Sequence, residues 1–90
     1  MFCIVISKQF KKDQKKLMKQ RKNLERLRKV LELLEQNKQL PAVYKDHPLH
    51  GELNGYRDCH IEGDLVLIYK IDRKEKMLLL QRIGTHSELF

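Results

Sequence analysis

The last 44 residues hold all four histidines of the chain, and three of these stand with one aspartate in or beside loops and strand ends. The four candidate residues are His47, His60, Asp64 and His86. Imidazoles suit proton transfer near neutral pH because their ordinary pKa is about 6.5. Metal-free RNA cleavage needs one group that takes the proton of the 2′-hydroxyl and another that protonates the departing 5′ oxygen. These residues are therefore candidates for acid–base catalysis on RNA.

Such a reaction also needs a cation beside the pentacovalent phosphorane. Arg82 and Arg57 are the candidates, because a guanidinium matches a phosphate with a two-pronged set of donors. Zinc hydrolases often carry two histidines at i, i+4 on a helix, and no pair here has that spacing. We expect no metal and no cofactor.

Each of these residues also has a purely structural interpretation. His60 could be a half-buried strand residue, His86 could cap the chain end, and His47 could order its loop. Asp64 follows Gly63, and aspartate favours turns for local hydrogen-bonding reasons. The residues alone leave both interpretations open.

Positive charge is concentrated in one segment. The net charge is +7, yet residues 8–38 hold 12 Lys or Arg against 4 Asp or Glu, and the other residues hold 7 against 8. This segregation is typical of a surface that binds a polyanion, although a solvated helix face has the same pattern. The predicted RNA and ribosome docking residues are Lys11, Lys12, Lys15, Lys16, Lys19, Arg21, Lys22 and Arg26.

The pattern of apolar residues predicts one α+β domain over residues 1–90, in the order β-α-α-β-β-β. Residues 1–6 read as a strand, Ser7 as the N-cap of a helix over 8–19, and residues 24–37 as a second helix with an apolar stripe. Residues 40–54 read as a loop. Three strands over 56–62, 65–71 and 77–83 form a meander, and both helices pack on one face of a twisted antiparallel sheet. The sequence does not indicate which of the three strands pairs with residues 1–6.

The composition also indicates the compartment in which we expect the chain. No apolar run is long enough to cross a bilayer, and residues 1–6 lack the features of a signal peptide. Cys3 and Cys59 have no second cysteine nearby, so we expect two buried thiols and a reducing cytoplasm.

Three separated segments carry a family resemblance: LPAVYKDHPL at residues 40–49, GYRDCH at 55–60 and RIGTHSELF at 82–90. Together they resemble the YafQ branch of the RelE-type bacterial toxins, over the whole chain. That family consists of mRNA interferases, which cut mRNA in the ribosomal A site and are neutralised by an antitoxin. The resemblance implies a RelE-like fold, a metal-free reaction that leaves a 2′,3′-cyclic phosphate and a 5′-hydroxyl, and basic helices that lie along ribosomal RNA. It also implies an acidic or amphipathic antitoxin segment.

The resemblance also assigns roles. The family's catalytic set falls on His47, His60, Asp64 and His86, with Phe90 placing the mRNA and Arg82 before the Gly-Thr-His motif. We assign His86 as general acid. His60 and Asp64 share base or orienting duties, and His47 lies near the substrate. Where the family pattern can carry Trp this chain has Leu65, so any base stacking there is absent.

Two rival hypotheses stay open. The chain could be a non-catalytic RNA-binding or ribosome-binding module with structural histidines, or a ribonuclease that needs no ribosome. Charge predicts RNA binding for all of them, so only cleavage separates them.

Overall fold

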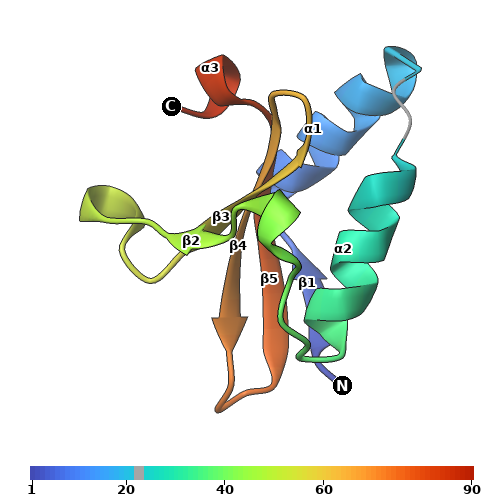
Figure 1. The fold of residues 1–90 in the computed structure, drawn as a ribbon. Helices are drawn as coiled ribbons and strands as arrows, with labels where there is room; N and C mark the ends of the chain where they lie inside the picture. The colour runs from blue at the N-terminus through green and yellow to red at the C-terminus, as the bar shows by residue number, and fades with distance from the viewer. Residues whose placement is uncertain (22–23) are drawn as a thin grey trace.

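Two helices cover one face of a five-stranded sheet in the computed structural model, which describes residues 1–21 and 24–90 (Figure 1). The elements are β1 (Cys3–Ile6), α1 (Lys8–Lys19), α2 (Glu25–Glu35), η1 (Ala42–Tyr44), β2 (His47–Pro48), η2 (Gly51–Leu53), β3 (Arg57–Glu62), β4 (Leu65–Asp72), β5 (Met77–Thr85) and α3 (His86–Leu89). The predicted α+β class and the order of the long elements are confirmed.

The sheet has the strand order β1-β5-β4-β3-β2. Strands β3, β4 and β5 form the predicted antiparallel meander. The additional strand β2 pairs antiparallel with β3, and β1 joins β5 in parallel. The prediction of a wholly antiparallel sheet is therefore wrong at one edge. Strand direction depends on the path of the chain through the helices, and the apolar pattern of six residues does not record it.

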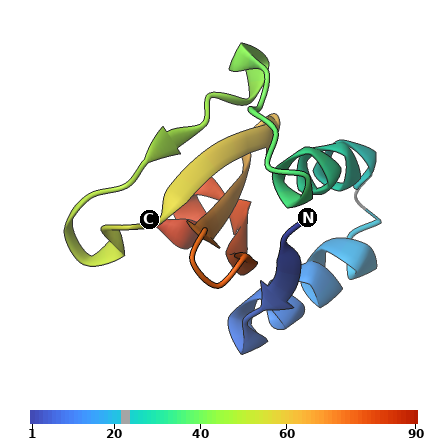
Figure 2. The same ribbon diagram turned by 90° about the horizontal axis from the view of Figure 1, so that it is seen from below.

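The predicted loop over residues 40–54 contains two 3₁₀ turns and the short strand β2. β2 pairs with β3 through His47 opposite Asp58 and Pro48 opposite Arg57. A proline lacks the N–H of a ladder and is tolerated at a sheet edge, where β2 lies. Figure 2 shows this yellow-green segment on the side of the sheet away from the helices.

The core lies between the helices and the sheet. Ser7 caps α1 as predicted, because its Oγ accepts the N–H of Phe10 at 2.9 Å. Phe10 and Leu17 of α1 are buried, whereas Met18 is exposed. The remaining core side chains come from the segment before β1, from α2, from the loop and from the sheet: Phe2, Leu27, Val30, Leu34, Leu40, Tyr44, Cys59, Ile61, Leu67, Tyr69, Leu78, Leu80 and Ile83.

The two cysteines differ. Cys59 is buried in the core, as predicted, and burial raises the pKa of its thiol far above the ordinary range. The prediction of a buried thiol is wrong for Cys3, which is exposed because β1 is an edge strand that leaves all four of its residues open to solvent. No helix among the described residues is long and apolar enough to span a membrane.

Candidate active site

The face of the sheet opposite the core carries polar side chains on three strands. His47 of β2, Asp58 of β3, Ile68 of β4 and Arg82 of β5 are successive cross-strand partners. Cross-strand partners share a face, and His60 shares it too because side chains alternate along a strand. Register therefore brings two predicted histidines to one surface, and Arg82 stands at the end of the same cross-strand row.

His47 is fixed by two acceptors. Its Nδ1 lies 2.8 Å from the carbonyl oxygen of Lys45 and 3.1 Å from Oδ1 of Asp58. Both neighbours accept hydrogen bonds, so Nδ1 carries the proton in the neutral ring and Nε2 keeps its lone pair. The His60 ring lies beside it, with the two ring centroids 6.4 Å apart. The two imidazoles form a pair in which His47 presents a basic nitrogen.

Asp58 stands beside this pair and was missed by the sequence analysis. Its side chain is 3% exposed, and its Oδ1 has no hydrogen-bond partner of good geometry. Burial raises the pKa of Asp58, while the charges of His47, His60 and His86 oppose that rise. The signal available in the sequence was position: Asp58 precedes His60 by two residues and so shares its face of the strand.

His86 comes to the same region from the far end of the chain. It opens α3, and its N–H donates to the carbonyl oxygen of Asp64 at 3.1 Å. The ring of Phe90 lies against it, with centroids 4.8 Å apart, and Phe90 is 52% exposed. The charge of His86 also acts to lower the pKa of Asp58.

Asp64 sits in the β3–β4 turn with an exposed side chain. It lines a cleft of about 910 Å³, together with Leu17, Gln20, Glu62, Gly63, Leu65, Thr85 and Glu88. Its backbone positions His86 through the bond just described. The catalytic use of its carboxylate stays a prediction.

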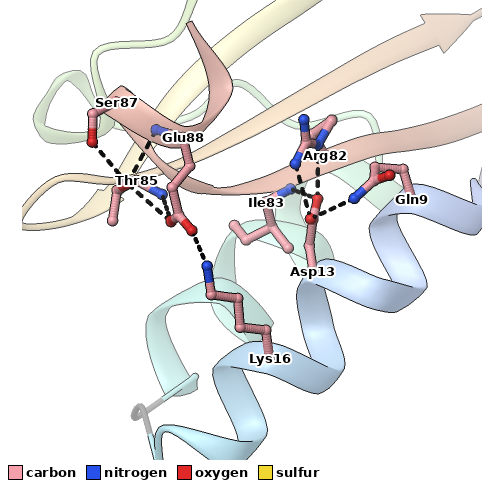
Figure 3. A network of polar contacts seen from close by, with 8 residues as sticks. All are labelled: Gln9, Asp13, Lys16, Arg82, Ile83, Thr85, Ser87 and Glu88. Atoms are coloured by element: carbon pink, nitrogen blue, oxygen red, sulfur yellow. Dashed lines mark hydrogen bonds and ion pairs between the residues drawn. The ribbon is translucent and has the colours of Figure 1, made fainter.

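Arg82 is held by Asp13 of α1 (Figure 3). The guanidinium donates through Nε at 3.0 Å and Nη2 at 3.1 Å, and the N–H of Ile83 donates to Asp13 at 3.1 Å. Burial alone would raise the pKa of Asp13, but the bonds from Arg82, Gln9 and Ile83 outweigh it and lower the pKa. The sequence analysis missed Asp13, although this acid lies between Phe10 and Leu17 on the buried side of α1.

A bulge in β5 accompanies this contact. The pairing with β4 shifts between Ile68 opposite Arg82 and Tyr69 opposite Leu80, which leaves Gln81 without a partner in the ladder. The hydroxyl of Ser7 donates to the carbonyl oxygen of Gln81 at 2.7 Å. Bulges re-aim side chains near active sites. Here the N-cap Ser7 and Asp13 in the second turn of α1 hold the bulge in place.

Arg57 lies elsewhere. It neighbours Asp58 in β3, so it points to the opposite face of the sheet. Its Nε and Nη2 donate to the carboxylate of Asp46 at 3.1 and 3.2 Å, and the hydroxyl of Tyr69 donates to the same carboxylate. The structure does not bring Arg57 to the histidines, and its predicted contact with phosphate stays a prediction.

Comparison with known proteins places the chain in a family. Residues 2–90 match the family model described as the bacterial toxin of the type II toxin-antitoxin system, YafQ. The chain belongs to the YafQ family. The mRNA interferase toxin YafQ of Escherichia coli strain K12 is 48% identical over 88 residues, which are 97% of this chain and 94% of that toxin.

Solved YafQ-family structures share the fold. The toxin in the crystal structure of the E. coli DinJ-YafQ complex has a TM-score of 0.90 and 46% identity, over 100% of this chain and 99% of that chain. A metal-bound toxin from Helicobacter pylori has a TM-score of 0.93 and 47% identity, over 100% of both chains. The predicted family resemblance is confirmed.

The eight docking residues predicted for this YafQ-family chain fall into three groups: exposed residues, residues with a partner, and one residue outside the described part of the chain. Five of them are exposed and have open side chains along and just after α1: Lys11, Lys12, Lys15, Lys19 and Arg21. Lys16 pairs with Glu88 of α3, and half-buried Arg26 lies over the Tyr44 ring at 5.2 Å from its centroid. The predicted docking residue Lys22 lies outside the described residues.

The metal-bound relative prompts a test of metal fit in this YafQ-family site. Within residues 1–21 and 24–90, no three or more side chains of His, Cys, Asp or Glu come together in a way that could hold a metal ion. The donors present do not fit a metal, so we derive no step through one.

Proposed function

We propose that the chain is the toxin of a type II toxin-antitoxin pair and an endoribonuclease that cleaves mRNA. Membership of the YafQ family and the mRNA interferase relative from E. coli support this function. The observation that carries it is the buried carboxylate of Asp58, which faces Nδ1 of His47 at 3.1 Å without a well-aligned hydrogen bond and lies under the electrostatic influence of three histidines. A fold that needed only stability would give such a group well-aligned hydrogen bonds, whereas an acid–base site keeps it facing an imidazole.

The reaction we propose is a transesterification by the 2′-hydroxyl. The pair His47 and His60 accepts the proton of that hydroxyl as its oxygen attacks phosphorus. Buried Asp58 stabilises the imidazolium that forms, through the 3.1 Å approach to His47. His86 protonates the departing 5′ oxygen. The bond from phosphorus to the 5′ oxygen breaks, leaving a 2′,3′-cyclic phosphate and a 5′-hydroxyl.

Arg82 stabilises the added charge on the phosphorane. Asp13 occupies its Nε and Nη2, which leaves Nη1 free to donate to a phosphate oxygen. Because Asp13 fixes the plane of the guanidinium, Arg82 loses little freedom when the substrate arrives. A lysine in its place lacks this planar fork and should serve poorly.

A second part of the proposal concerns the path of the RNA. A small cleft of about 210 Å³ adjoins His60 and is lined on its other sides by Arg26, Val43, Lys45, Ile61, Glu62 and Gly63. Its two cations suit a phosphate next to the one that is cut. The exposed ring of Phe90 suits stacking on an RNA base at the end of the proposed site away from this cleft.

We also propose that cleavage takes place on the ribosome, in the cytoplasm, with the open lysines of α1 on ribosomal RNA. A cognate antitoxin covers the site, by analogy with the E. coli DinJ-YafQ complex. An acidic antitoxin segment would bind more weakly as salt rises. Titration of the complex with salt tests this, and an affinity that does not change would contradict an electrostatic interface.

The decisive experiment compares two histidine variants in a translating extract. Mapping of mRNA ends should find cuts with the wild-type chain and none with His86→Ala. His50→Ala is the matched control, because His50 is exposed and makes no contact with the histidine cluster in the described part of the chain. Equal cutting by His86→Ala and wild type would remove His86 from the mechanism.

Two further arms separate the rival functions. Purified protein is incubated with naked mRNA and with ribosome-bound mRNA. Equal cutting of both would contradict ribosome dependence. Binding without any cutting by the wild-type chain would favour the non-catalytic RNA-binding module.

A further inference from the structure

The C-terminal turn α3 is too short to hold its own position. It spans only His86–Leu89, whereas isolated helices shorter than about 12 residues are marginal in water. It nevertheless carries His86 and leads into Phe90, the two groups that the proposed function places on the substrate. Something outside α3 must therefore fix it.

Three contacts hold α3 to the end of β5 and to the β3–β4 turn. Thr85 and Glu88 form a capping box, in which Glu88 accepts the N–H of Thr85 at 3.0 Å and Thr85 Oγ1 accepts the N–H of Glu88 at 3.3 Å. The carbonyl oxygen of Asp64 holds the N–H of His86. Leu89 packs over Gly84, where a Cβ would lie 3.3 Å from Leu89 Cδ2 and 3.4 Å from Glu88 Oε1.

The fourth contact reaches across the molecule. Glu88 gives one carboxylate oxygen to the capping box and the other to the ammonium of Lys16 (Figure 3). Lys16 belongs to α1, 72 positions away in the chain. This ion pair and the Thr85 bonds lower the pKa of Glu88 to about 2, so the pair stays charged throughout the neutral range.

We propose that Lys16 and Glu88 are positioning residues for catalysis: their ion pair holds α3 against α1 and so fixes the position of His86 and Phe90 for the reaction. Lys16 then differs from its neighbours on α1, whose open charges serve docking. The inference rests on the proposed function, since it takes His86 to be the group that protonates the leaving oxygen.

The size of the effect follows from the exposure of the pair. The side chains of Lys16 and Glu88 are 59% and 36% exposed, and an exposed ion pair is weak because water and salt screen it. Its loss shifts the balance between docked and released α3 by up to about fivefold. We therefore expect a moderate loss of rate and not inactivation.

The test is a double-mutant cycle on cleavage rate. Lys16→Gln and Glu88→Gln should each lower kcat about twofold to fivefold, and the double variant should be no slower than either single variant. Glutamine at position 88 keeps the capping box, so only the ion pair is lost. Lys16→Arg should restore most of the rate.

A docking role predicts a different pattern. Lys15→Gln is the matched control, because it removes the same charge from the same helix and Lys15 has no charged partner in the described structure. If Lys16 served only to dock RNA, Lys16→Gln and Lys15→Gln would raise KM equally, and Glu88→Gln would cleave as fast as wild type. Either that pattern or additive losses in the double variant would overturn the inference.

Gly84→Ala disturbs α3 without removing a charge. The added methyl group meets Leu89 and Glu88, so it should push α3 from β5 and lower kcat as well. Unfolding by urea serves as the folding control for all variants. NMR of the amides of residues 85–90 reads the position of α3 directly, and Lys16→Gln and Glu88→Gln should shift and broaden them while Lys15→Gln should not.

The NMR arm separates the two proposals. If the wild-type chain does not cleave but the amides respond as expected, the proposed function fails and the positioning contact stands. If the chain cleaves and the amides of residues 85–90 are unchanged in Lys16→Gln, the positioning inference fails alone.

Discussion

The carboxylate of Asp58 is buried, and burying a charged group does not favour folding. It lacks a well-aligned hydrogen bond, while the rings of His47 and His60 lie near it. Partly buried carboxylates elsewhere in the chain, Asp13 and Asp46, are each paired with an arginine. Asp58 faces the imidazole of His47 instead, which points to a group kept for reaction.

Asp58→Asn should separate stability from activity. Burial raises the pKa of Asp58 in the folded state, so the folded chain binds this proton more tightly than the unfolded chain. The free energy of unfolding therefore falls as pH rises from the ordinary pKa of an aspartate through the raised value. Asparagine does not titrate and escapes this cost. At pH 7 we expect unchanged or greater stability, and a cleavage rate lower by about tenfold or more.

Urea unfolding and initial cleavage rates check this prediction. Asp72→Asn is the control, because Asp72 Oδ1 accepts the N–H of Glu75 and an asparagine oxygen does the same. A variant at position 58 that is markedly less stable but equally active would show that the carboxylate is structural.

Chelation tests the metal-free character of the reaction. Since the described residues offer no group of three or more metal-binding side chains, cleavage in EDTA should stay within about twofold of the untreated rate. The assay uses RNA or ribosomes whose own integrity in EDTA has been verified. Loss of cleavage that returns on addition of one particular metal ion would contradict the proposed mechanism.

At the scale of elements, α1 does more than present lysines. Asp13 ties it to Arg82 and Ile83, Ser7 ties it to the bulge at Gln81, and Lys16 ties it to α3. The contacts of Ser7 and Asp13 meet the part of β5 that extends beyond its pairing with β1, and the contact of Lys16 meets α3, which follows β5. Helix α1 thus contacts the part of β5 that has no pairing with β1.

Asp13→Asn should weaken this attachment. It removes a charge that is nearly buried and leaves Arg82 with a poorer partner, so we expect a loss of about 1–3 kcal/mol at pH 7. The pKa of Asp13 is lowered in the folded state, so its contribution is present above 3.8, the ordinary value, and is lost as pH falls through the lowered value. The variant should therefore lose less stability than wild type on acidification below about pH 4.

Urea titrations at pH 7 and pH 3 measure both effects. Glu32→Gln is the control, because Glu32 forms an exposed i, i+4 pair with Arg28 and should cost less than about 0.5 kcal/mol. Equal losses for the two variants would mean that Asp13 acts as an ordinary surface charge.

Elements with strong local patterns could be predicted from the sequence. Helix α1 has an N-cap and regular apolar spacing, and the three long strands have turn residues between them, so their bounds agree closely with prediction. The parallel pairing of β1, the strand β2 and the partner of Asp58 depend on register between distant segments. No local pattern records them, which is why Asp13 and Asp58 were missed while the histidines were found by residue type.

At the scale of the whole molecule, charge and chemistry occupy different elements. The open lysines of α1 stand apart from the polar row on the outer face of the sheet, and the net charge is +7. Docking and cleavage should therefore respond to different substitutions.

The double variant Lys11→Gln, Lys15→Gln should lower the dependence of RNA affinity on salt. Each lost phosphate contact reduces the slope of log affinity against log salt by roughly 0.7, so the slope should fall by about one to one and a half. The same change at Lys74 and Lys76, in the β4–β5 turn, is the control and should leave the slope unchanged. Equal effects of both pairs would mean that net charge, and not α1, governs binding.

The contact between α1 and α3 joins residues that are 72 positions apart in the chain. A ribosome completes Lys16 long before it adds Glu88, so a nascent chain has its docking helix but lacks the turn that carries His86. The charged surface can form while the chemistry cannot. A protein proposed to attack translation would thus stay harmless to the ribosome that is making it until residues 86–90 emerge.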